Sequence, residues 1–148
     1  MRPLRAGDAE HVQQFVRRLS ARSRLERFFA PIAELSPAQL ARLASGPGVK
    51  LAAFDERGEI VALAEYACDG AAHAEVALAV ADEWQGKGLG RRMLAHLIRH
   101  AGRAGIARLE GVTRAGNAAM RRLAGGLGFA LRRDADPRLV RFERPPTR

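Results

Sequence analysis

Three glycines at alternate positions, Gly86, Gly88 and Gly90, stand between two segments of different periodicity. Residues 73–81 alternate in side-chain size, as a strand with one buried face does, whereas the apolar residues of 91–103 recur with the helical period. The chain therefore passes from a strand, through a glycine-rich loop, into the N-terminus of its longest helix. This order limits the fold to one in which the end of a strand meets the start of a helix.

The glycine-rich loop has the properties of a binding site for an anion. Glycine adopts positive φ without strain and lets the backbone approach a ligand, so several N–H groups of the loop can converge on one point. The helix N-terminus adds about half a positive charge there, and Lys87, Arg91 and Arg92 are close in the sequence. Because each charge-assisted hydrogen bond contributes roughly 1.5 to 3 kcal/mol, a few of them would hold a pyrophosphate.

Two other phosphate-binding motifs are excluded by spacing. The dinucleotide fingerprint G-x-G-x-x-G, counted from Gly86, needs a glycine where Arg91 stands, although Glu110 occupies the place of its acidic residue. A P-loop requires a G-K-[ST] segment, which the chain lacks. A glycine-rich turn that only begins a helix is the structural alternative, but its glycines would cost conformational entropy without any gain in binding.

The remaining periodicities predict one domain over residues 1–148, with no linker or internal repeat. Its elements follow the order β-α-α-β-β-β-α-β-α-β-β, which makes the fold class α+β (α/β). The predicted strands are residues 2–6, 49–55, 60–67, 73–81, 106–113, 131–133 and 139–143, with a turn at Asp69-Gly70. The predicted helices begin after Asp8, at Ser36-Pro37, behind the glycine loop and at Asn117.

Composition bears on the partners of the protein. The net charge of +9 would suit nucleic acid, but only 5% of the residues are aromatic and no nucleic-acid-binding motif occurs. A basic surface for an anionic cofactor is therefore favoured. The chain has no apolar run of about 18 residues, which predicts a cytoplasmic protein without a membrane span. The one cysteine, Cys68, is predicted to fill a small space in the core.

The segment Gln85-Gly86-Lys87-Gly88-Leu89-Gly90 resembles the Q/R-x-x-G-x-G/A motif of the GNAT superfamily of N-acetyltransferases. Asn117, Leu123 and Gly128-Phe129 resemble the second conserved block of that family, and the element order is similar over essentially the whole chain. The resemblance implies a mixed, mainly antiparallel twisted sheet with helices on both faces. It also implies an enzyme that transfers an acetyl group from acetyl-CoA to a primary amine.

Two finer expectations come from the same resemblance. Residues 23–29, 35–43, 74–94 and 117–129 resemble the acetyltransferase domain of bacterial protein-lysine acetyltransferases, which implies a protein lysine as acceptor, with small amines as the alternative. The strand before the loop would bind the pantetheine arm of the cofactor, and the loop amides would bind its pyrophosphate. The implied cofactor-binding residues are Leu78, Ala79, Val80, Gln85, Gly86, Lys87, Gly88, Leu89, Gly90, Arg91 and Asn117.

The reaction requires a base, because a lysine-like amine has a pKa of about 10.4 and is protonated at neutral pH. Glu75 is the predicted general base. It begins the strand face that continues with Ala77, Ala79 and Ala81, small residues that leave room for a ligand, and it matches the glutamate of the family at that strand. Glu65 is the second candidate, and a surface ion pair with an arginine is the structural alternative for Glu75.

The expected general acid is missing. Many family members carry a tyrosine seven residues after the asparagine of the second block, and here that position is Ala124. Tyr66, the only tyrosine, or a solvent proton would have to protonate the thiolate. The absent tyrosine also motivates a non-catalytic acyl-CoA sensor as an alternative. His96 and His100 have a metal-compatible spacing but no H-E-x-x-H motif, so no metal site is predicted and both are expected to be solvated.

Overall fold

The computed structural model describes residues 1–68 and 72–145, whose strands form one sheet of order β1-β2-β3-β4-β5-β7-β6. The strands are β1 (Arg2–Pro3), β2 (Val49–Phe54), β3 (Ile60–Cys68), β4 (His73–Val80), β5 (Arg108–Arg114), β6 (Ala130–Arg133) and β7 (Leu139–Arg144). The helices are α1 (Ala9–Arg18), α2 (Ala21–Phe28), α3 (Pro37–Ser45), α4 (Leu89–Arg103) and α5 (Ala118–Gly126), with 3₁₀ turns η1 (Ala6–Asp8) and η2 (Asp82–Trp84).

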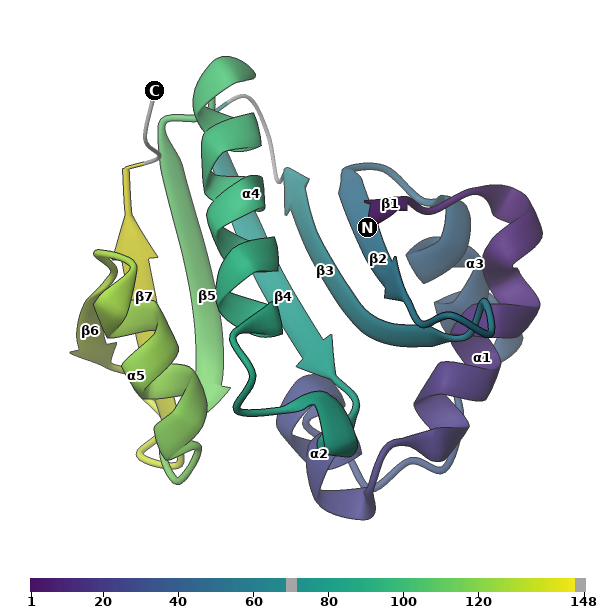
Figure 1. Cartoon of the computed structure of the whole chain (residues 1–148). Coiled ribbons are helices and arrows are strands. Elements are labelled where there is room, and N and C mark those ends of the chain that lie inside the picture. Colours follow the sequence, from purple (N-terminus) through teal and green to yellow (C-terminus); the bar gives the residue numbers. More distant parts are fainter. Residues whose placement is uncertain (69–71, 146–148) are drawn as a thin grey trace.

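The junction between β4 and β5 is the feature of the sheet that matters for function. The two strands run parallel and pair only from His73 with Arg108 to Glu75 with Glu110, whereas β4 stays paired with β3 as far as Val80. Beyond Glu75 the strands diverge, and Figure 1 shows their C-terminal ends apart, with the start of α4 near the opening. The other strand pairs among the described residues are antiparallel.

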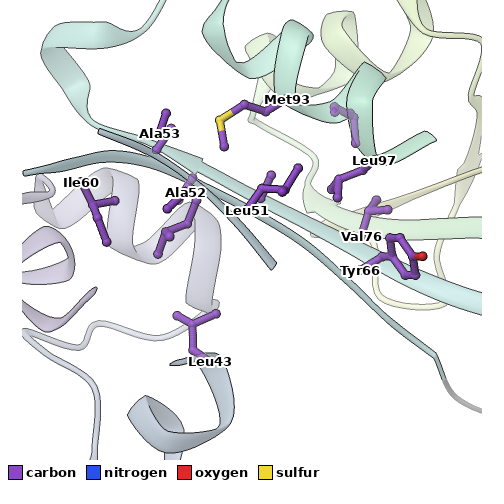
Figure 2. Packing of buried hydrophobic residues seen from close by; sticks show 14 of the residues in the cluster. Leu43, Leu51, Ala52, Ala53, Ile60, Tyr66, Val76, Met93 and Leu97 are labelled. Carbon is purple, nitrogen blue, oxygen red and sulfur yellow. The ribbon is translucent and has the colours of Figure 1, made fainter. Parts of the chain in front are cut away.

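The helices cover the sheet on both faces (Figure 1). Figure 2 shows Met93 and Leu97 of α4 on one side of the sheet and Leu43 of α3 on the other. These side chains are buried because α4 and α3 repeat apolar residues at helical spacing and so present one continuous apolar stripe to the sheet. Packing on both faces of the sheet therefore holds β3 and β4 in place, and β4 is the strand that leads toward the glycine loop.

The helix α2 is absent from the predicted order and is a correction to it. None of its residues is buried, so it lacks the apolar stripe from which a helix is recognised. It begins instead at Ser20, whose hydroxyl accepts a hydrogen bond from the Ser23 amide as an N-cap. Polar contacts hold it to the rest of the protein, among them an ion pair of 3.0 Å between Arg27 and Glu65.

The predicted fold class is confirmed by this mixed sheet with helices on both faces. The prediction for Cys68 is wrong: its side chain is exposed at the end of β3. The predicted turn at Asp69-Gly70 lies outside the described residues. Among the helices of the described chain, none has the length and apolar character needed to cross a bilayer.

Candidate active site

A cleft of about 770 Å³ opens where β4 and β5 diverge. Its walls come from β4, β5, α2, the loop before α4, and the first turns of α4 and α5. A volume of this size suits a large organic ligand. The sequence-predicted residues that line it include Glu75, Leu78, Ala79, Val80, Gln85, Gly86, Gly88, Leu89, Gly90, Arg91 and Asn117.

The edge of β4 that faces the cleft carries free backbone groups. The Ala81 amide donates to the Val61 carbonyl on the β3 side at 2.8 Å. Because backbone groups alternate along a strand, the amides of Leu78 and Val80 point the other way, toward β5. β5 has already separated from β4 at that point. An extended ligand with amide groups could thus pair with this edge as a strand would.

The glycine loop presents a second set of backbone donors. Gly86 and Gly88 have φ of 75° and 85°, a region that other residues adopt only with strain. No described residue accepts a hydrogen bond from the amides of residues 86–91, and the first helical bond runs from Arg92 to the Gly88 carbonyl. The loop is exposed from Gly86 to Gly88. Unpaired amides at a helix N-terminus form a site for an anion such as phosphate.

Cationic side chains lie around these amides. Arg91 and Arg122 line the cleft, and neither has a carboxylate within 4.0 Å among the described residues. Lys87 does not line the cleft; its ammonium lies 5.4 Å from the centre of the Trp84 ring. Arginines thus supply positive charge along the cleft, and one of them, Arg122, lies on α5 outside the motif.

Gln85 has a different place from the glycines that follow it. Its backbone amide donates to the Asp82 carbonyl, and its side-chain Nε2 donates to the Val80 carbonyl at 2.9 Å and to the Ser23 hydroxyl at 3.2 Å. Since both donors are occupied within the protein, Gln85 braces the loop against β4 and α2. The predicted ring of phosphate-binding amides therefore begins at Gly86.

Asp82 completes the connection between the loop and α2. Its carboxylate accepts hydrogen bonds from the Ser20 amide, the Ser20 hydroxyl and the Ser23 hydroxyl at 2.9 to 3.0 Å. Burial acts to raise the pKa of Asp82, but these hydrogen bonds outweigh it and hold the pKa below its ordinary value. The position of α2 is thus tied to the segment that precedes the glycine loop.

The third glycine of the motif, Gly90, lies close to β4, which explains why this position carries no side chain. A Cβ atom at Gly90 would lie 3.1 Å from a methyl group of Leu78 and 3.5 Å from a methyl group of Val80. The missing side chain lets the first turn of α4 approach β4 closely. Leu78 and Val80 consequently face α4, so both contribute side chains to one face of the sheet and backbone amides to its open edge.

Ala77 and Ala79, on the alanine-rich face of β4, line the cleft and also have a second role that the sequence did not predict. Ala77 and Ala79 lie on the side of α2, and they line a small void together with Arg27 and Phe28. Ala79 is 9% exposed. These small residues therefore let α2 pack near the sheet, and the space for a ligand lies mainly between the diverging strands.

Glu75 lies at the last position where β4 and β5 pair, and it lines the cleft. Its side chain is exposed, and no arginine or lysine of the described chain forms an ion pair with it. Its cross-strand neighbour Glu110 lies 3.6 Å from the His73 ring and does not line the cleft. The Glu75 carboxylate interacts electrostatically with Arg27 but has no ion-pair partner within 4.0 Å among the described residues, so it is available at the narrow end of the cleft to accept a proton.

Glu65 is engaged in a structural contact. Its carboxylate lies 3.0 Å from Arg27 and 4.0 Å from Lys50, and its side chain is only 20% exposed. Lys50 also donates to the Gly46 and Pro47 carbonyls. Because Glu65 neutralises two nearly buried cations, it is poorly placed to exchange protons with a substrate.

Tyr66 is also removed from the cleft. It is 3% exposed, it does not line the cleft, and its hydroxyl lies 2.7 Å from Nδ1 of His100 on α4. Burial raises the pKa of Tyr66 above its ordinary value. His100 is therefore a partner of Tyr66 as well as a surface residue. Ala124, at the position of the family tyrosine, is fully buried.

Asn117 caps α5, as predicted: its Oδ1 accepts a hydrogen bond from the Met120 amide at 3.1 Å. Among the cleft residues that sequence reasoning missed are Glu26 and Thr113. Each holds one buried oxygen, Oε2 and Oγ1, to which no described residue gives a hydrogen bond. The sequence carries no signal for either, since only the fold brings α2 and β5 to the same cleft.

Comparison with known proteins agrees with this geometry. Residues 15–129 match the model of the acetyltransferase (GNAT) family. The chain is 40% identical over 143 residues to acetyltransferase PA5475 of Pseudomonas aeruginosa, a match that covers 92% of this chain and 77% of that protein. The chain therefore belongs to the GNAT family of acetyltransferases. It is an acyl-CoA-dependent N-acetyltransferase, of a family that generally uses acetyl-CoA and acts on amines.

Solved structures show the same fold. The GNAT domain of S. lividans PAT superposes with a TM-score of 0.90 at 31% identity, covering 97% of this chain and 88% of that chain. The ribosomal-protein-S18-alanine N-acetyltransferase of Escherichia coli superposes with a TM-score of 0.75 at 24% identity, covering 99% and 92%. The second likeness shows the fold alone, so the architecture does not determine the acceptor.

Proposed function

We propose that this domain transfers the acetyl group of acetyl-CoA to a primary amine, with a protein lysine as the leading acceptor and Glu75 as the general base. The observation that carries the proposal is the continuity of the cleft. It runs from the unpaired amides of the glycine loop, along the free edge of β4, to the unpaired carboxylate of Glu75. The likeness to the GNAT domain of S. lividans PAT supports a protein acceptor.

The residues present fit coenzyme A. The amides of residues 86–91, with Arg91 and Arg122, would bind its phosphates, because they combine unpaired donors with positive charge. The backbone amides of Leu78 and Val80 would pair with the pantetheine arm. Acetyl-CoA would supply a thioester, whose acyl carbon is the electrophile.

The chain's own side chains handle the protons and charges of the proposed reaction. The acceptor enters as an ammonium ion beside Glu75 of β4 and Glu26 of α2, two carboxylates that line the cleft. Glu75, directly or through a water, takes one proton, and the free amine attacks the acyl carbon, so that a C–N bond forms and the C–S bond breaks. Tyr66 lies outside the cleft, and Ala124 stands at the position of the family tyrosine. The thiolate therefore takes its proton from solvent or from the attacking nitrogen.

The test is turnover of acetyl-CoA with a panel of proteins and small amines, followed by intact mass. Glu75→Gln should lower kcat by a factor of about 10² to 10⁴, the usual contribution of a general base, and should leave CoA affinity unchanged. Glu110→Gln, on the neighbouring strand but outside the cleft, is the matched control and should turn over normally.

The outcomes distinguish the alternatives. Normal turnover by Glu75→Gln would remove Glu75 from the mechanism. If only small amines were acetylated, the acceptor would be a small amine and not a protein lysine. Tight CoA binding without turnover on any amine would favour the non-catalytic sensor.

A further inference from the structure

The hydroxyl of Thr113 is a buried polar group without a hydrogen-bond partner among the described residues. Thr113 is 2% exposed, and no described residue gives its Oγ1 a hydrogen-bond partner. A buried hydroxyl without a partner costs free energy, whereas valine has nearly the same shape and no polar atom. A threonine at this position therefore requires an explanation that the packing alone does not provide.

The position of Thr113 suggests that explanation. It lies on β5 three residues beyond Glu110, the last residue that pairs with β4, and it lines the cleft. If the parallel pairing continued, Thr113 would stand opposite Leu78, whose backbone amide also faces the gap. Side chains alternate along β5, so Thr113 shares the face of Gly111 and Leu109. That face also carries Phe142, which packs over Gly111.

We propose that the Thr113 hydroxyl is a cofactor-binding group that hydrogen-bonds an amide of the pantetheine arm of coenzyme A. This inference rests on the proposed function, because it assumes that the arm lies between β4 and β5. β4 then contacts the arm through backbone amides and β5 through the Thr113 side chain. A hydroxyl both donates and accepts, so it can pair with either end of an amide.

The test compares Thr113→Val with Thr113→Ser, which keeps the hydroxyl. Calorimetry is done with CoA and with adenosine 3′,5′-bisphosphate, which lacks the arm, and thermal unfolding is followed without ligand. Thr113→Val should weaken CoA binding roughly 2- to 12-fold, the value of one neutral hydrogen bond, and leave the affinity for the bisphosphate unchanged. Its unfolding temperature without ligand should be equal to or above that of the wild type, and Thr113→Ser should bind CoA like the wild type.

Three results would overturn the inference. Equal CoA affinity of Thr113→Val and wild type would show that the hydroxyl does not contact the cofactor. A lower unfolding temperature together with equally weakened binding of both ligands would show that the hydroxyl serves the fold. Failure of the wild type to bind CoA would instead refute the proposed function itself.

Discussion

Gly88→Ala tests the glycine loop with one added methyl group. The φ of Gly88 is 85°, and a Cβ there would meet no atom within 4 Å, so the substitution introduces no clash. Its effect is confined to the backbone, because alanine in this region costs roughly 1 to 2 kcal/mol. The exposed loop can relieve that strain by rotating Gly88 toward negative φ, which would turn the amides of Leu89 and Gly90 away from their common point.

The size of the effect on binding follows from the lost donors. Loss of one charge-assisted hydrogen bond to a phosphate, roughly 1.5 to 3 kcal/mol, weakens CoA binding about 10- to 150-fold. The part of the strain that the loop retains also lowers the unfolding temperature, by at most about 2 to 8 °C for a chain of this size. Calorimetry with CoA and a thermal unfolding scan measure the two effects separately.

Gly58→Ala is the matched control. Gly58 has a φ of 79° and open space around it, but it lies in the turn between β2 and β3, away from the cleft. It should show a similar loss of stability and no change in CoA affinity. CoA binding by Gly88→Ala at the wild-type affinity, or an equal loss in both variants, would refute the reasoning.

Three further predictions concern groups around the cleft. Glu65→Gln should lower the free energy of unfolding by on the order of 2 kcal/mol, seen in denaturant melts, because it leaves Arg27 without its counter-charge; an unchanged melt would contradict this. Tyr66→Phe should keep wild-type kcat while losing about 1 kcal/mol of stability with its bond to His100, and a large loss of kcat would restore Tyr66 as the general acid. The hydrogen bonds that lower the pKa of Asp82 stabilise the fold fully when the pH is above the ordinary pKa of 3.8, and this contribution is lost as the pH falls through the pKa of the folded state. The difference in unfolding temperature between wild type and Asp82→Asn should therefore be constant above about pH 5 and shrink at lower pH, whereas a difference that does not change with pH would contradict this prediction.

Local sequence patterns were sufficient to predict the glycine loop and the two elements beside it. The alternation of β4, the helical period of α4 and the glycines between them are properties of consecutive residues, so the sequence predicts them. The helix α2 was missed because polar bonds to residues as far away as Asp82 and Glu65 hold it, and these do not appear in a local window. The two unpaired oxygens of Glu26 and Thr113 depend on the same long-range assembly.

The side-chain roles were harder to predict than the backbone. Gln85 belongs to the motif, yet its side chain contacts Val80 and Ser23 within the protein. The alanines of β4 indicate space, but the fold gives part of that space to α2. In both cases the residue type was informative and its partner depended on an element distant in the sequence.

Binding of the coenzyme A pyrophosphate by the backbone amides between Gly86 and Arg91 can be observed residue by residue. The experiment follows the amide resonances of the ¹⁵N-labelled protein by NMR during a CoA titration. We expect the largest shifts on residues 86–91, with further shifts at Leu78 and Val80. Saturable CoA binding that leaves these amides unshifted and perturbs another surface would contradict this expectation.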